Sequence, residues 1–72
     1  MTDVITLEYY LKKAHITKKM YAKKLGISLQ CLYNKLNNIS EFKQAEIVAT
    51  CELLGLSGEK RDEIFFARNV DY

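Results

Sequence analysis

The segment from residue 18 to residue 37, KKMYAKKLGISLQCLYNKLN, constrains the fold of this chain more than any other stretch. It contains a small residue, Ala22, then a glycine four positions later, and two leucines ten and fourteen positions after the alanine. A small side chain lets two helices cross closely, and Gly26 permits a tight turn between them because glycine adopts the left-handed conformation without steric cost. The spacing therefore predicts a helix-turn-helix over about residues 18–37.

Helical periodicity extends beyond this segment to the whole chain. Apolar residues recur with the period of about 3.6 residues expected of a helix, and no useful length alternates with the period of two typical of a strand. Capping residues and glycines divide the pattern into five predicted helices. These helices cover about residues 7–14 after Thr6, 18–25 between Thr17 and Gly26, 29–36 between Ser28 and the Asn37-Asn38 pair, 44–54 before Gly55, and 58–67 after Ser57. Residues 68–72 are predicted to form a frayed tail.

Each predicted helix places apolar side chains on one inward face. These side chains are Leu7, Tyr10, Leu11 and Ala14, then Tyr21, Ala22 and Leu25, then Leu32 and Leu36, then Ile47, Val48, Cys51 and Leu54, and finally Ile64 and Phe65. Phe42 is expected to form a hydrophobic staple with Ile47. Cys31 and Cys51 are expected to be small buried residues with reduced thiols. The pattern predicts one all-α domain over residues 1–72.

Several functional classes are excluded by what the sequence lacks. It has no apolar run of the roughly 18 residues that a membrane helix needs and no apolar signal segment, so a cytoplasmic protein without membrane contact is expected. Because it has no glycine-rich phosphate loop and no paired carboxylates, neither catalysis nor a small-molecule substrate is expected. His15 is the single histidine and has no cysteine at ligand spacing, so we expect no metal and no cofactor.

The charges are strongly segregated along the chain. Residues 12–40 contain seven lysines and no acidic residue, whereas residues 1–11 carry a net charge of −2 and residues 41–72 a net charge of −3. A basic middle third favours an anionic partner, either a nucleic acid or an acidic protein surface.

Three motifs give the chain a resemblance to a known family. They are AKKLGIS, LYNKLN, and SEF followed by a helix that ends in Ile64-Phe65-Phe66. Over about residues 5–67 the chain resembles the phage-repressor and Cro-like helix-turn-helix regulators. The resemblance implies five helices, a third helix that reads the DNA major groove, and a role in the lysogeny switch of a temperate phage in a bacterial host cell.

The resemblance also implies which residues face the partner. Lys18 matches a phosphate-contacting position at the start of the second helix. The outward face of the third helix is matched by Ser28, Leu29, Gln30, Tyr33 and Asn34, whereas Lys35 and the turn at Asn37 and Asn38 match positions that flank the nucleic-acid backbone. Met20 would extend this surface, and Lys19, Lys23 and Lys24 would supply supporting contacts to phosphate or to an acidic protein.

Two departures from the family pattern put direct DNA reading in doubt. Leu29 stands where family members commonly carry arginine or another long polar residue, and Asn38 stands where they carry glycine. Arginine is the commonest reader of guanine, yet the chain has none before Arg61. Gln30 and Asn34 suit adenine, but a surface that combines them with leucine and tyrosine fits a protein partner equally well.

The chain also has a narrower similarity to the antirepressors that modulate repression in lactococcal phages. Together these features leave three hypotheses for the function. The preferred one is an antirepressor that binds the N-terminal helix-turn-helix domain of the phage repressor. The alternative is a Cro-like repressor that binds operator DNA in the major groove. A structural or adaptor domain is the third. A combined role, in which repressor and operator DNA are bound together, also stays open.

Overall fold

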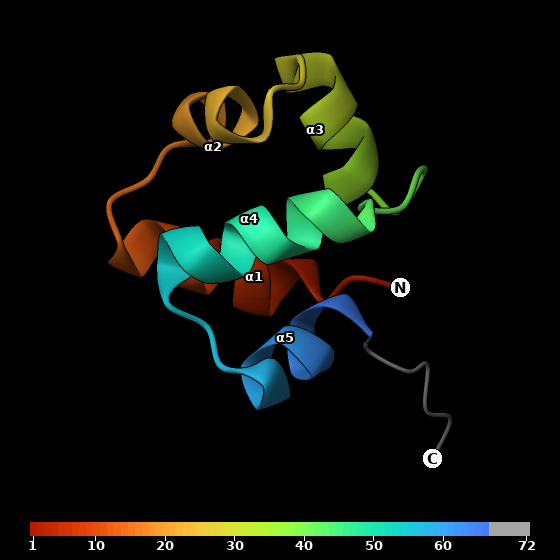
Figure 1. Cartoon of the computed structure of the whole chain (residues 1–72). Coiled ribbons are helices and arrows are strands. Elements are labelled where there is room, and N and C mark those ends of the chain that lie inside the picture. The colour runs from red at the N-terminus through yellow and green to blue at the C-terminus, as the bar shows by residue number, and fades with distance from the viewer. Residues whose placement is uncertain (67–72) are drawn as a thin grey trace.

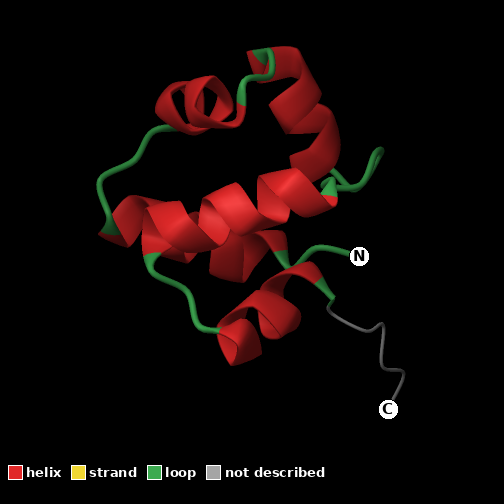
Figure 2. Cartoon of the chain, viewed as in Figure 1, coloured by secondary structure: helices red, strands yellow, loops and turns green. Residues whose placement is uncertain are grey.

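Five helices make up the described part of the chain. The computed structural model describes residues 1–66, so the predictions for Ala67 and for residues 68–72 lie outside the described residues. The helices are α1 (Val4–Lys13), α2 (Lys18–Leu25), α3 (Leu29–Leu36), α4 (Gln44–Leu54) and α5 (Gly58–Phe65). Figure 2 shows only helices and loops over these residues. The predicted all-α class with five helices is therefore confirmed.

The helices surround a central α4 (Figure 1). In this view α2 and α3 lie on one side of α4, while α5 lies on the other and α1 passes behind it. Close packing joins α2 to α3, α2 to α4, and α5 to both α1 and α4. Because α2 and α3 are held at the edge of the bundle, their outer sides face away from the body of the protein.

Four of the five helices begin at a side chain that accepts a hydrogen bond from the first turn. Thr17, Ser28 and Ser57 occupy the cap positions predicted for α2, α3 and α5. The prediction for α1 was wrong: Asp3 is the cap, and its carboxylate accepts bonds from both the backbone and the hydroxyl of Thr6. A carboxylate also stabilises the positive end of a helix, so α1 begins three residues earlier than expected.

The helix ends at Gly26 and Gly55 agree with the sequence prediction. Both glycines adopt left-handed backbone angles, with φ of 73° and 65°. At the first of them, Gly26 N–H donates to Lys23 and Ile27 N–H donates to the carbonyl of Ala22. These bonds satisfy carbonyls at the end of α2 and turn the chain directly into α3. By contrast, α5 ends at Phe65, two residues before the predicted end.

The core forms between the inward faces of all five helices. Its buried apolar residues are Leu7, Leu11, Tyr21, Ala22, Leu32, Leu36, Phe42, Ile47, Ile64 and Phe65. Three predictions were wrong, because Ala14 and Cys31 are exposed and Val48 is 49% exposed. Val48 lies one residue beyond Ile47 and thus about 100° around the helix, outside the buried stripe.

The inward face of α4 contains a buried threonine instead. Thr50 is fully buried, donates to the carbonyl of Glu46 at 2.8 Å, and shares a 2.6 Å hydrogen bond with the hydroxyl of Tyr21. These bonds satisfy the polar atoms and make their burial tolerable. Burial raises the pKa of Tyr21 to about 12, against the opposing effect of the hydrogen bond with Thr50. The hydrogen bond between Tyr21 and Thr50 therefore links α2 to α4 in the core.

None of the described helices combines the length and the apolar character needed to cross a membrane.

Candidate functional site

The outer surface of α2 and α3 presents a mixture of apolar and polar side chains. We call the surface formed by Met20, Ser28, Leu29, Gln30, Tyr33 and Asn34 the α2–α3 face. Its large apolar members are accessible, with Met20 54%, Leu29 37% and Tyr33 40% exposed. They project outward because Tyr21, Ala22, Leu32 and Leu36 occupy the inward sides of the same two helices.

The polar members of this face are partly fixed by local hydrogen bonds. Ser28 accepts a bond from the backbone N–H of Cys31 at 3.1 Å, so its hydroxyl serves first as the cap of α3. Gln30 donates to the side chain of Asn34 at 3.2 Å, one helical turn further on. The Gln30–Asn34 pair keeps two amide groups side by side and accessible along α3.

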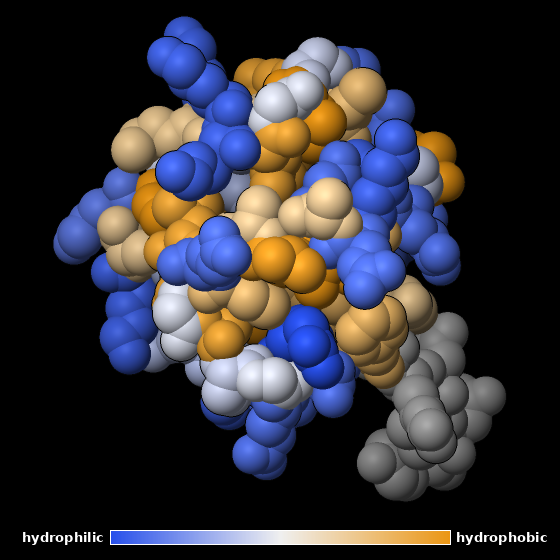
Figure 3. Space-filling model, viewed as in Figure 1, coloured by the Kyte–Doolittle hydropathy of each residue, from blue (hydrophilic) through white to orange (hydrophobic). Residues whose placement is uncertain are grey.

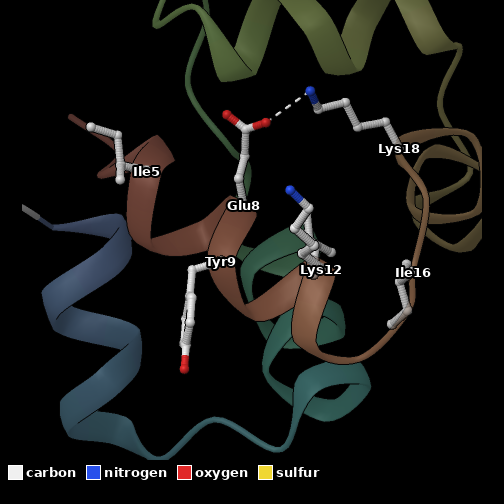
Figure 4. A pocket seen from close by; sticks show the side chains of 7 residues that line it. Ile5, Glu8, Tyr9, Lys12, Ile16 and Lys18 are labelled. Carbon is white, nitrogen blue, oxygen red and sulfur yellow. Dashed lines mark ion pairs between the residues drawn. The ribbon is translucent and has the colours of Figure 1, made fainter.

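Lys18 bridges the α2–α3 face to α1. Its Nζ atom lies 2.8 Å from Oε2 of Glu8, and the same ammonium lies 5.9 Å from the ring centroid of Tyr33. The hydrogen bond with Glu8 raises the pKa of Lys18. Figure 4 shows the carboxylate of Glu8 and the amine of Lys18 facing each other above Lys12 and Ile16. The predicted phosphate-contacting lysine is thus already paired with a carboxylate.

Lys35 does not belong to the exposed surface, which corrects the prediction that it flanks a partner. It is 7% exposed, and its Nζ atom lies 2.9 Å from Oε1 of Glu46 and 3.0 Å from the carbonyl oxygen of Glu41. The ammonium also lies 5.8 Å from the ring centroid of Phe42. The long stem of a lysine can follow an apolar surface inward, and here a buried carboxylate meets its charge.

The partner of Lys35 is fixed by a second contact. Oε1 of Glu46 accepts a 2.8 Å bond from the backbone N–H of Lys43 at the start of α4. Burial by itself would raise the pKa of Glu46, but the bonds from Lys43 and Lys35 outweigh it and hold that pKa below the usual range. Lys35 therefore anchors the end of α3 to the beginning of α4.

The turn after α3 is only partly available for contacts. Asn37 is exposed and ends α3, as predicted. Asn38 has φ of 58°, a left-handed conformation that asparagine tolerates better than most residues. Its side-chain oxygen accepts a 3.0 Å bond from the backbone N–H of Thr2. This bond gives Asn38 a structural role at the position where the resembled family carries glycine.

The remaining predicted lysines form the rim of the face. Lys19, Lys23 and Lys24 are exposed on α2, and within residues 1–66 none of them has a carboxylate at ion-pair distance. Figure 3 shows hydrophilic side chains projecting at the edge formed by α2, while apolar surface lies over α4. The free positive charge of this face therefore lies on the side of α2, away from Lys35.

Glu8 is the residue that sequence reasoning missed. It stands among the apolar residues of α1, and its pairing with Lys18 depends on how α1 and α2 pack. Its one sequence signal is its position: Glu8 lies ten residues before Lys18, and no acidic residue occurs between Glu8 and Glu41.

Over residues 1–66 no three His, Cys, Asp or Glu side chains are placed to hold a metal ion. No family model matches the chain, and neither the curated proteins nor the solved structures contain a significant match. The α2–α3 face and the charges around it are therefore the basis for a functional assignment.

Proposed function

We propose that this protein is a small phage regulator with a Cro/repressor-like helix-turn-helix fold, formed by α2, the Gly26 turn and α3. It acts as an antirepressor: the α2–α3 face binds the N-terminal DNA-binding domain of the phage repressor. The motifs AKKLGIS and LYNKLN support this proposal through their resemblance to phage regulators. The cytoplasm of a bacterial host is the compartment in which such a regulator acts.

The observation that carries the proposal is that the α2–α3 face exposes large apolar side chains while two of the lysines predicted to contact a partner are paired with carboxylates. Met20, Leu29 and Tyr33 are all exposed, whereas Lys18 is paired with the partly exposed carboxylate of Glu8 and Lys35 with the buried carboxylate of Glu46. DNA affinity depends chiefly on lysines and arginines that neutralise phosphates. Protein interfaces instead take their energy from a few apolar and aromatic anchors inside a polar rim. The composition of the face fits the second description.

The expected mechanism is direct competition. A repressor reads its operator with the outer side of its own recognition helix. If Leu29 and Tyr33 pack against that helix, the repressor cannot enter the major groove while the complex persists. Exposed Lys19, Lys23 and Lys24 at the rim would meet acidic groups of the repressor and favour the correct orientation. The competition requires no conformational change in either protein.

One observation favours a second candidate function, direct binding to operator DNA. The exposed amide pair of Gln30 and Asn34 lies on the outer side of α3, and glutamine or asparagine amides pair with the major-groove edge of adenine. A Cro-like repressor would combine these amides with the lysines of α2 on phosphates. Leu29 would then contact a thymine methyl group.

Fluorescence anisotropy distinguishes the two functions. The protein is titrated onto labelled duplex DNA from the phage switch region, onto random duplex, and onto the labelled repressor domain. We expect saturable binding to the repressor domain and weak, non-specific binding to both duplexes. Tight binding to the switch-region duplex with a steep dependence on salt, and none to the repressor domain, would establish the Cro-like function instead.

A further inference from the structure

Glu8, Lys18 and Tyr33 form a cluster that joins three helices at the edge of the α2–α3 face. Glu8 lies on α1, Lys18 is the first residue of α2, and Tyr33 lies in α3. The side chains of Glu8 and Lys18 are 43% and 39% exposed, so the pair is open to an approaching macromolecule. The cluster is therefore accessible at the edge of the α2–α3 face.

The Glu8 carboxylate occupies one of the hydrogen-bonding positions that Lys18 could offer to a phosphate. An ammonium and a phosphate oxygen make their strongest contact at about 2.7–2.9 Å, and Oε2 of Glu8 already lies 2.8 Å from Nζ of Lys18. Because the ammonium of Lys18 has two further N–H donors, a phosphate could still reach it, but only beside a carboxylate that already neutralises its charge. The phosphate charges of a duplex bound at Lys18 would lie a few ångströms from the negative charge of Glu8.

We propose that Glu8 is a specificity-determining residue that excludes nucleic acid from the α2–α3 face while leaving it open to a protein. This inference rests on the proposed function, because it explains how a surface of this kind avoids DNA. Glu8 neutralises Lys18, whose ammonium lies 5.9 Å from the ring centroid of Tyr33, and it leaves the apolar side chains of the face uncovered. A protein partner that packs on Leu29 and Met20 does not need a free ammonium at Lys18.

The chain offers a matched control for removing this charge. Glu63 pairs with Lys60 on α5 at 3.2 Å, and both side chains are about half exposed. E8Q and E63Q raise the net charge by the same amount and free one lysine each. Only E8Q frees a lysine beside the α2–α3 face, so a difference in DNA affinity between the variants reports the position of the charge and not the total charge.

The experiment measures binding to a random-sequence duplex by anisotropy at several salt concentrations, using the wild type, E8Q, E63Q and the double variant E8Q/K18Q. One added phosphate contact steepens the salt dependence by about 0.9 in the logarithmic slope. The ratio of the DNA affinity of E8Q to that of the wild type should therefore fall about threefold between about 50 and about 200 mM salt. E63Q and E8Q/K18Q should bind like the wild type. Circular dichroism confirms that each variant is folded.

The outcomes separate the two proposals. If E8Q binds the duplex more tightly than the wild type, and neither E63Q nor E8Q/K18Q does so, the role of Glu8 is supported. Equal gains in DNA affinity for E8Q and E63Q, or no gain for E8Q, would overturn this role. Binding of the wild type to the repressor domain is measured in parallel: if it is present while E8Q gains no DNA affinity, the proposed function stands and the role of Glu8 fails. Tight DNA binding by the wild type would refute both.

Discussion

Replacing Lys35 with methionine tests whether this lysine anchors α3 to α4 rather than contacting a partner. Lys35 and Glu46 keep only 9% of their side-chain surface exposed, and their charged atoms lie 2.9 Å apart. Methionine preserves the length of the side chain but leaves the Glu46 carboxylate buried without a counter-charge. Removing one member of a buried ion pair costs about 3–5 kcal/mol. Because Glu46 retains the bond from Lys43 N–H, we expect K35M to lose about 3 kcal/mol of unfolding free energy, at the lower end of this range.

Thermal and urea unfolding followed by circular dichroism measure this loss. In a domain of this size about 1 kcal/mol lowers Tm by about 4–8 °C, so K35M should melt at least about 12 °C below the wild type. Lys24→Met is the control, because Lys24 is exposed on α2 and its replacement should change stability by less than about 0.5 kcal/mol. The double variant K35M/E46Q should be more stable than K35M, since it removes the stranded charge.

The pH dependence gives the same test a second readout. The folded state lowers the pKa of Glu46, so the stability that the carboxylate contributes is present above its unfolded pKa, near 4.5, and is lost as pH falls through the folded value. The difference in stability between the wild type and K35M should therefore shrink in acid. A loss below about 1 kcal/mol for K35M, or equal losses for K35M and K24M, would refute the anchoring role of Lys35.

Three further predictions follow from the face, the core and the turn. Leu29→Arg should weaken binding to the repressor domain by about 2 kcal/mol or more and leave duplex affinity equal or higher; unchanged repressor affinity in anisotropy would exclude Leu29 as an anchor. The pKa of Tyr21 is raised to about 12, whereas an unfolded tyrosine ionises near 10, so stability should fall between these pH values. If the urea midpoint of Tyr21→Phe declined between pH 10 and 12 as steeply as that of the wild type, the fall could not be assigned to Tyr21. Gly26→Ala should cost about 1–2 kcal/mol, because φ is 73° although nothing would crowd the added Cβ. Gly58→Ala, at a position without positive φ, should be neutral or stabilising in the same melts.

Local chemistry explains why most of the fold was predictable. The caps at Thr17, Ser28 and Ser57 and the glycine at the end of α2 act within four residues of where they stand, so the sequence contains the whole interaction. The cap of α1 was missed because Asp3 and Thr6 are both good caps, and only the backbone path chooses between them. Val48 was misplaced because an apolar residue at the margin of a helical stripe does not itself reveal which way the helix is rotated.

The candidate face was predicted less completely than the fold. Met20, Leu29 and Tyr33 are exposed, as an outward face requires, because the helical period fixes their direction relative to Leu32 and Leu36. Whether that face binds a repressor or DNA stays a prediction. Lys35 looked like its surface neighbours in a run of lysines, and its burial depends on a carboxylate eleven residues later in another helix.

Caps, φ preferences and the helical period are local properties, so the order of the amino acids was enough to predict five helices, their glycine turns and the apolar stripe of each. Which lysines keep an unpaired charge depends on how the helices pack. The pairing of Lys18 with Glu8 and of Lys35 with Glu46 arises where different helices pack together. An ion pair needs two charges within about 4 Å, and no local rule of sequence states which distant carboxylate will approach a given lysine.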